Sequence, residues 1–138
     1  MRFMMLYKPG KESNTPPSHE EIARMGEFIE KMARSGVLIA TDGLAPSSKG
    51  ARVQFSNGRF TVTDGPFAEA KELIAGYAIV EASSKAEAIA MAKDFLAVVG
   101  EGESEVRQMH DPADFADAMT PELKEQEERW RAELASRQ

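Results

Sequence analysis

The sequence predicts an α+β domain in which two β-α-β units flank a central β-hairpin. Short apolar segments alternate with two stretches of helical periodicity, in the order strand, helix, strand, hairpin, strand, helix, strand. The pair Asn57-Gly58, which favours a type I′ turn, lies between two alternating segments at the middle of the chain. With 138 residues, the chain is long enough for one domain with its own core. The predicted arrangement is the ferredoxin-like one.

Each expected element has its own signal in the sequence. Ser18 and Glu21 have the spacing of a helix-capping box, as do Ser84 and Glu87, and Gly36 is typical of the residue that follows a helix end. Apolar residues at spacings of three and four follow both capping boxes. In chain order we expect a strand at 3–7, a helix from 18 to Gly36, a strand at 37–40, the hairpin around 57–58, a strand at 73–82, a helix from 84 to 99 and a strand at 104–109.

The hairpin register follows from the turn. A two-residue loop at Asn57-Gly58 pairs Phe55 with Phe60 and Val53 with Val62, and opposed residues share one face of a hairpin. These four apolar side chains therefore lie together, whereas Arg52, Gln54, Thr61 and Thr63 lie on the other face. The turn and the hydrophobic pattern agree, which supports the hairpin.

The expected sheet is apolar on both faces, although the two helices of this topology cover only one. The segments 3–7 and 37–40 are apolar throughout, and Tyr77 and Ile79 alternate with small residues on the strand at 73–82. An uncovered apolar face of several hundred Å² is rare on monomers. We therefore expect a second cover, either another copy of the chain or the chain's own C-terminal helix.

The last 28 residues read as a separate helical tail, so we divide the chain into a domain at 1–110 and a tail at 111–138. Thr120 and Pro121 are favourable as the cap and first residue of a helix over 122–135. Its large apolar residues, Leu123, Trp130 and Leu134, form one narrow stripe on an otherwise charged helix.

Composition excludes several classes of function. The net charge of −6 argues against direct nucleic-acid binding, and the chain contains no cysteine for disulfides, thiolate catalysis or cysteine-based metal sites. No apolar run approaches the roughly 20 residues of a membrane span, and residues 1–11 lack the cleavage site of a signal peptide. The two histidines are isolated, and no phosphate-binding loop is present, so no metal or cofactor is expected. We expect a cytoplasmic protein.

The segment Asp64-Gly65-Pro66-Phe67 resembles the signature of the DGPF family, a branch of the YCII-related proteins. The flanking segments Gly36-Val37-Leu38, Gly43-Leu44-Ala45-Pro46 and Glu105-Val106-Arg107 fit the same family. The resemblance covers roughly residues 1 to 110 and implies a dimeric α+β barrel, in which the sheets of two subunits face each other. It identifies a family rather than a reaction. In the sister YciI branch a His–Asp pair is the candidate acid–base dyad, but Met25 stands at the position of that histidine here.

The signature loop supplies the first candidate site residues. Asp64 is either a turn residue that accepts backbone hydrogen bonds or a general base beside a pocket. Arg52 lies near Asp64 in the expected register and suits an ion pair or an anion. Phe67, Glu69 and Lys71 complete the loop, where the charges are either solvated or hold the loop over a ligand.

Further candidates lie on the strands. Asp42 is followed by Gly43, which indicates a turn after the second strand or a ligand contact, and Tyr77 projects from the face that needs a cover. His19 and His110 lie at a helix start and a strand end, where structural roles are the simpler interpretation.

Two hypotheses of function follow. The first is a homodimer that binds a small organic ligand in a barrel pocket, with acid–base chemistry of isomerase or lyase type in which Asp64 is the base and Arg52 or Lys71 holds an oxyanion. The second is a non-catalytic sensing or interaction module linked to transcription regulation, with the tail helix as its contact surface. A large apolar pocket with an ionisable group favours the first, and a filled centre with an exposed Trp130 stripe favours the second.

Overall fold

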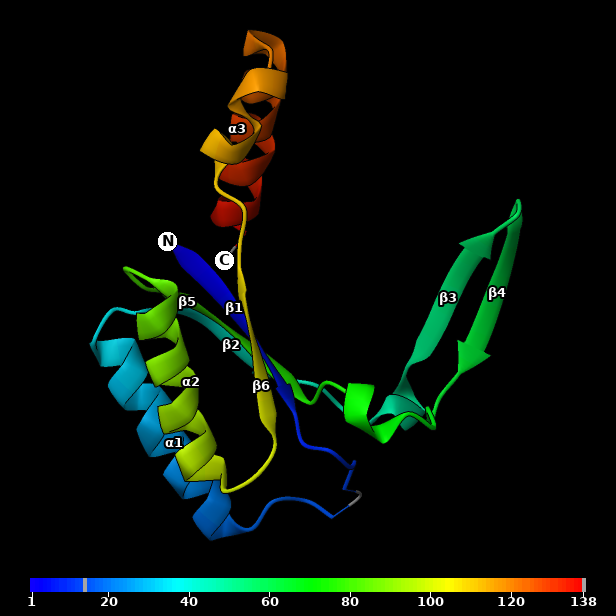
Figure 1. Ribbon diagram of the computed structural model, residues 1–138, viewed down its shortest axis with the longest axis vertical. Helices are drawn as coiled ribbons and strands as arrows, with labels where there is room; N and C mark the ends of the chain where they lie inside the picture. Colours follow the sequence, from blue (N-terminus) through cyan, green and yellow to red (C-terminus); the bar gives the residue numbers. More distant parts are fainter. Residues whose placement is uncertain (14, 138) are drawn as a thin grey trace.

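The computed structural model describes residues 1–13 and 15–137 and divides them into one four-stranded sheet, one two-stranded hairpin and three α-helices (Figure 1). The elements are β1 (Arg2–Lys8), α1 (His19–Arg34), β2 (Leu38–Gly43), β3 (Ala51–Ser56), β4 (Arg59–Asp64), β5 (Gly76–Glu81), α2 (Lys85–Val99), β6 (Glu103–Gln108) and α3 (Pro121–Ser136), with short 3-10 helices at Ser47–Lys49, Ala70–Glu72 and Pro112–Ala118.

The main sheet has the strand order β2-β5-β1-β6, and every neighbouring pair is antiparallel. The central strand β1 pairs with both β5 and β6, so that Met5 lies opposite Ala78 on one side and Val106 on the other. This order, with α1 and α2 as the two crossover helices, is the ferredoxin-like topology. The predicted fold class is therefore confirmed, with β3 and β4 inserted between β2 and β5 and α3 added at the end.

Helices α1 and α2 lie on the same side of the sheet (Figure 1). The core forms where α2 meets the sheet: Phe3 and Val80 are 1 % exposed, and Ala88 and Ala92 of α2 are buried against them. The small side chains on both surfaces allow this close approach, as the alternation of small residues on β5 predicts.

Helix α1 is held differently. Its capping box forms as predicted, with the Ser18 hydroxyl accepting from the Glu21 N–H at 3.1 Å and the Glu21 carboxylate accepting from the Ser18 N–H. Its apolar stripe also forms, yet no residue of α1 is buried, and Ile22 is 58 % exposed. The stripe faces a space between the helix and the sheet instead of interlocking with the core.

Two element boundaries and one capping interaction differ from the predictions. Strand β2 continues through Asp42 and Gly43, which are paired with β5 and so do not form the predicted turn. Strand β5 begins at Gly76 instead of 73, because the chain first forms a 3-10 turn and then buries Leu73. The second capping box forms only in half: Ser84 caps α2, but the Glu87 carboxylate accepts hydrogen bonds from Ser83.

The sheet face away from α1 and α2 has an apolar centre and a charged border. Met4 and Leu6 of β1 lie opposite Ile79 and Tyr77 of β5, and all four are half-buried. On the β6 side, Lys8 Nζ lies 3.0 Å from Glu105 Oε1 and Arg107 Nη1 lies 3.1 Å from Glu105 Oε2. Helix α3 stands beyond the end of the sheet and does not cover this face (Figure 1).

The hairpin register is confirmed, with Phe55 opposite Phe60 and Val53 opposite Val62. The hairpin is not part of the main sheet, from which it projects (Figure 1). Helix α3 begins at Pro121 with Thr120 as its cap, close to the predicted position, and its Leu123, Trp130 and Leu134 are 46 %, 43 % and 52 % exposed. Among the described residues, no helix has the length and hydropathy needed to cross a membrane.

The ion pairs on β6 make the stability of the protein depend on pH in the acid range. Hydrogen bonds from Lys8 and then Arg107 hold the pKa of Glu105 below its usual value of 4.5. A lowered folded-state pKa stabilises the fold above that value, and the contribution is lost as the pH falls through the folded pKa. We expect Glu105→Gln to lose less stability than the wild type between about pH 5 and about pH 3.

Urea unfolding at a series of pH values checks this expectation. Glu125→Gln on α3 is the control, because Glu125 forms no ion pair among the described residues. Identical acid sensitivity in Glu105→Gln and the wild type would show that the ion pairs of Glu105 do not contribute to the pH dependence of stability.

Candidate functional site

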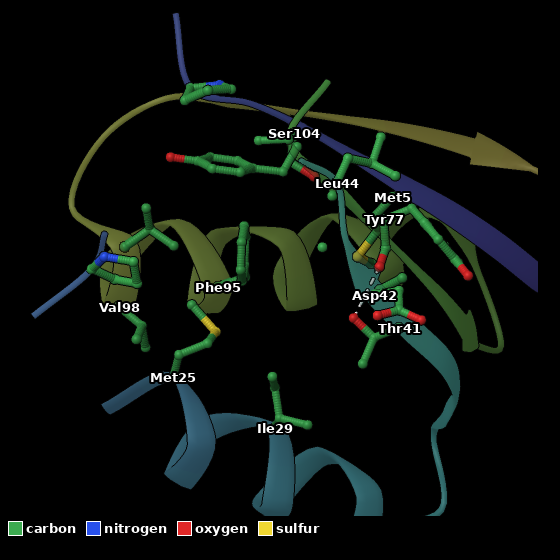
Figure 2. Close-up of a pocket in the computed structure, with 18 of the residues that line it drawn as sticks. Met5, Met25, Ile29, Thr41, Asp42, Leu44, Tyr77, Phe95, Val98 and Ser104 are labelled. Carbon is green, nitrogen blue, oxygen red and sulfur yellow. Dashed lines mark hydrogen bonds between the residues drawn. The ribbon is translucent and has the colours of Figure 1, made fainter. Parts of the chain in front are cut away.

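A cavity of ≈ 990 Å³ lies between α1 and the helix-covered side of the sheet. Helix α1 contributes Met25 and Ile29, α2 contributes Phe95 and Val98, and β1 contributes Met5 (Figure 2). The cavity exists because α2 packs closely on the sheet through alanines, whereas α1 stands further away. Its walls are mainly apolar, which is typical of sites for small organic molecules.

Three aromatic rings form one wall of this cavity. The ring of Tyr7 meets the ring of Phe95 edge to face, with centroids 5.2 Å apart and planes at 83°. Phe28 of α1 lies against the same Phe95 with centroids 6.2 Å apart. Edge-to-face packing fixes the orientation of such rings and leaves flat surfaces for other aromatic groups.

Tyr7 also carries a hydroxyl group at the cavity. This hydroxyl donates a hydrogen bond to the Glu101 carbonyl oxygen at 3.0 Å. Burial, and secondarily the negative charge of Glu101, raises the pKa of Tyr7 above its usual value of 10.0. The phenol therefore stays protonated near neutral pH and serves as a hydrogen-bond group rather than as a base.

The polar rim of the cavity lies at the end of β2. The Thr41 hydroxyl donates to the main-chain oxygen of Tyr77 at 2.9 Å, and Asp42 follows it on the rim (Figure 2). Two other carboxylates line the cavity, but both are engaged: Glu12 accepts hydrogen bonds from Ser47, and Glu21 accepts one from the cap of α1. Within residues 1–13 and 15–137, the Asp42 carboxylate has neither a hydrogen bond nor an ion pair. Asp42 is paired with Tyr77, so its side chain lies on the face of the edge strand β2 away from the helices, next to the rim, and has capacity for a ligand.

The signature loop forms a second cluster, at the base of the hairpin. The Arg52 guanidinium lies 4.1 Å from the centroid of the Phe67 ring, in a cation–π contact. The Phe67 N–H donates to the Ser47 hydroxyl oxygen at 3.0 Å, and that hydroxyl donates to Glu12 Oε2 at 2.8 Å. The Gly65 N–H donates to the Gly50 carbonyl oxygen at 3.0 Å. These contacts tie the loop after β4 to the loop after β1.

The predicted site residues therefore fall into two separate groups. Asp42 and Tyr77 border the cavity, although the strand register places their side chains on the sheet face away from α1 and α2, whereas the other five candidates do not border it. Asp64 ends β4 opposite Ala51 and is exposed. The residues outside the cavity are Arg52, Asp64, Phe67, Glu69 and Lys71.

Sequence reasoning missed the aromatic wall and the link between Glu12 and Ser47. Tyr7, Phe28 and Phe95 follow the apolar periodicity of their elements, so nothing distinguished them from core residues. Glu12 and Ser47 are 35 positions apart in irregular segments, where no spacing rule connects them. Among the described residues, no group of three or more metal-ligating side chains comes together.

The chain is similar to known proteins in sequence. The sequence model of the YCII-related domain matches residues 1–110. A protein of Rhizobium meliloti (strain 1021) described as "Uncharacterized protein R00369" is 36 % identical over 64 residues, which are 46 % of this chain and 52 % of that protein. The match thus spans about half the length of that relative.

A solved structure also resembles this chain. It is the 5-chloro-2-hydroxyhydroquinone dehydrochlorinase of Burkholderia phenoliruptrix AC1100, in complex with 2,5-dihydroxybenzoquinone. The similarity covers 83 % of this chain and 98 % of that one, with a TM-score of 0.43 and 14 % identity. The family model matches most of the sequence, so the chain belongs to the YCII-related family.

The signature glycine is predicted to be indispensable for the hairpin base. A Cβ added to Gly65 would lie 1.7 Å from the Ser47 carbonyl oxygen, and backbone atoms cannot move away without displacing the loop. We expect Gly65→Ala to lower the free energy of unfolding by roughly 1–3 kcal/mol. Gly50→Ala is the matched control, because its added Cβ meets nothing closer than 3.6 Å.

Denaturant unfolding of both variants measures the difference. The control is expected to stay within about 0.5 kcal/mol of the wild type. Equal stability of Gly65→Ala and the wild type would contradict the close contact between Gly65 and Ser47.

Proposed function

We propose that this protein binds a small, flat and mainly apolar organic molecule in the cavity between α1 and the sheet. The single observation that carries the proposal is the cavity itself: ≈ 990 Å³, walled by apolar side chains and three aromatic rings. Sites for small molecules commonly have volumes of about 300–1,000 Å³ with a few polar groups. The rings favour an aromatic or conjugated ligand, because such a ligand stacks on them.

The rim gives the ligand a preferred orientation. The apolar part would lie against Phe28 and Phe95, and a hydroxyl or similar donor would extend past the edge strand β2 to the Asp42 carboxylate on its other face. A carboxylate without an internal partner accepts a hydrogen bond from such a donor and is placed to accept its proton. Proton transfer on a hydroxylated conjugated compound is therefore the chemistry that we propose for the site, with Asp42 as the base.

Asp64 remains a separate proposal for the base. It belongs to the signature loop, Arg52 of β3 is the candidate group for an anion, and both lie outside the cavity lining. A ligand held there would contact the base of the hairpin instead of the aromatic wall. The two carboxylates thus define two distinct sites that substitution can separate.

We also propose that the functional form is a homodimer through the sheet face away from α1 and α2. The face combines an apolar centre of Met4, Leu6, Tyr77 and Ile79 with charged residues along β6, and stable interfaces have this composition. This is the barrel arrangement that the family resemblance implies. Residues 1–110 would form the barrel unit and residues 111–138 an appended tail.

The competing proposal is a non-catalytic interaction module that contacts other proteins through α3. The exposed stripe of Leu123, Trp130 and Leu134 supports it. A module of this kind has no need of a cavity, and the cavity is not filled by the protein's own side chains. Ligand binding is therefore the function that the geometry supports better.

We expect 2-naphthol, a flat aromatic alcohol with its own fluorescence, to bind in the cavity. Ile29→Trp places a larger side chain in the cavity wall and should weaken binding by about tenfold or more, since apolar volume is lost. Glu125→Trp, which adds the same ring on the exposed surface of α3, should not change the affinity. A fluorescence titration measures both dissociation constants.

Paired amide variants locate the polar end of the ligand. Asp42→Asn should weaken 2-naphthol binding by roughly tenfold, because a hydrogen bond to a charged group is lost, whereas Asp64→Asn should leave it unchanged. The reverse result would place the site at the signature loop. Equal affinities in Ile29→Trp and the wild type would exclude the cavity.

The dimer is tested by a charge placed at the centre of the sheet face. Ile79→Asp should abolish the dimer, because an unpaired carboxylate in a dry interface costs several kcal/mol, roughly 3–5. Ile89→Asp on α2, at a side chain that is 39 % exposed, is the matched control and should remain dimeric. Sedimentation equilibrium at micromolar concentration checks this, and a wild-type mass of 15.2 kDa, that of one chain, would contradict the proposed dimer.

A further inference from the structure

The β3–β4 hairpin, residues 51–64, stands away from the rest of the chain and is exposed at every position of both strands. We call it the arm. Its apolar face consists of Val53, Phe55, Phe60 and Val62, which are 65 %, 65 %, 74 % and 62 % exposed. The ring centroids of Phe55 and Phe60 lie 4.7 Å apart, so the two rings form a continuous apolar surface. Four large apolar side chains at this exposure form the type of patch that marks a docking surface.

The rest of the chain does not cover the apolar face of the arm. A two-stranded hairpin alone is marginally stable in water, so its apolar face requires a partner. Its base is fixed by the hydrogen bond between Gly65 and Gly50 and by the contact of Arg52 with Phe67. A Cβ at Gly65 would overlap Ser47, which shows how closely the base is packed. The arm therefore projects as a fixed element and does not fold back onto its own sheet.

The accessible surface of the chain exceeds that of a compact monomer. The structure exposes 10569 Å², whereas a compact monomer of 15.2 kDa exposes about 7,100 Å². The difference of roughly 3,400 Å² is several times the ~800 Å² that each partner contributes to a standard interface. A second copy of the chain can cover an area of this size, while a short peptide cannot.

The direction of the arm fits a second copy. The arm lies on the side of the main sheet opposite α1 and α2 (Figure 1). A second sheet placed on the face of Met4, Leu6, Tyr77 and Ile79 would come within reach of the arm, and two-fold symmetry would return the same contact. The opposite face of the arm carries Arg52, Gln54, Thr61 and Thr63, which suit contact with water.

We propose that the arm is exchanged between subunits, with its apolar face packed on a second copy of this chain. The inference deepens the proposed dimer and rests on it. Each subunit would then be held by the sheet contact and by two reciprocal arms. The polar face of the arm would remain in solvent, and the Gly65 base would set the angle at which the arm leaves its own subunit.

The first measurement is the dimer dissociation constant. Phe55→Ser combined with Phe60→Ser should raise it by about 100-fold or more, since two large apolar side chains lose their burial. Gln54→Ser combined with Thr61→Ser on the opposite face is the matched control and should stay within about threefold of the wild type. An unchanged constant in the double Phe variant overturns arm exchange, although the sheet-mediated dimer would stand if Ile79→Asp dissociates it.

The second measurement shows which chain the arm touches. The chain has no cysteine, so Val53→Cys provides a single attachment point for a benzophenone photocrosslinker. Isotopically light and heavy subunits are mixed, and mass spectrometry identifies crosslinked peptides. Mixed-isotope crosslinks from Val53→Cys, absent from Thr61→Cys, support arm exchange. Crosslinks confined to one chain overturn it, and a monomeric wild-type protein overturns both it and the proposed dimer.

Discussion

The distance at which each helix lies from the sheet determines the rest of this structure. Alanines at 88 and 92 allow α2 to contact Phe3 and Val80 directly, which creates a small, dry core. Helix α1 has larger side chains on its sheet-facing side and no buried residue, so it lies over a cavity. One crossover helix thus packs into the core, and the other forms the wall of a cavity. The same fold obtains both properties from a difference in side-chain size.

The signature loop has a structural role that is visible in its contacts. Glu12 and Ser47 link the segment after β1 to the segment before the hairpin, and the Phe67 N–H joins the same hydrogen-bonded chain. Gly65 allows the backbone to approach Ser47 closely. Because this network lies between the cavity rim and the arm, it determines where both are placed relative to the sheet. The Asp64–Phe67 segment thus connects the base of the arm to the loops beside the cavity.

The sequence predicts the local structure of this protein better than its site. Capping residues, the Asn57-Gly58 turn and alternating side chains act through neighbours in the chain, so the helix starts and the hairpin register follow from them. The cavity depends on how far α1 lies from the sheet, and that distance results from packing between distant segments. For the same reason, the sequence indicates Asp42 as a candidate residue but does not predict that β2 extends through it. The half-formed second capping box reflects competition from Ser83, which offers Glu87 two donors.

The few contacts between α1 and the core would connect the proposed ligand binding to local stability. A helix without buried residues makes few apolar contacts with the core, so we expect it to open locally more readily than α2, which has two buried alanines. A molecule in the cavity would supply the apolar contacts that the side chains of α1 do not make with the sheet. Its binding free energy would then appear as added resistance of α1 to local unfolding. Amide hydrogen exchange in α1 would consequently report on occupancy, even for a compound whose chemistry is unknown.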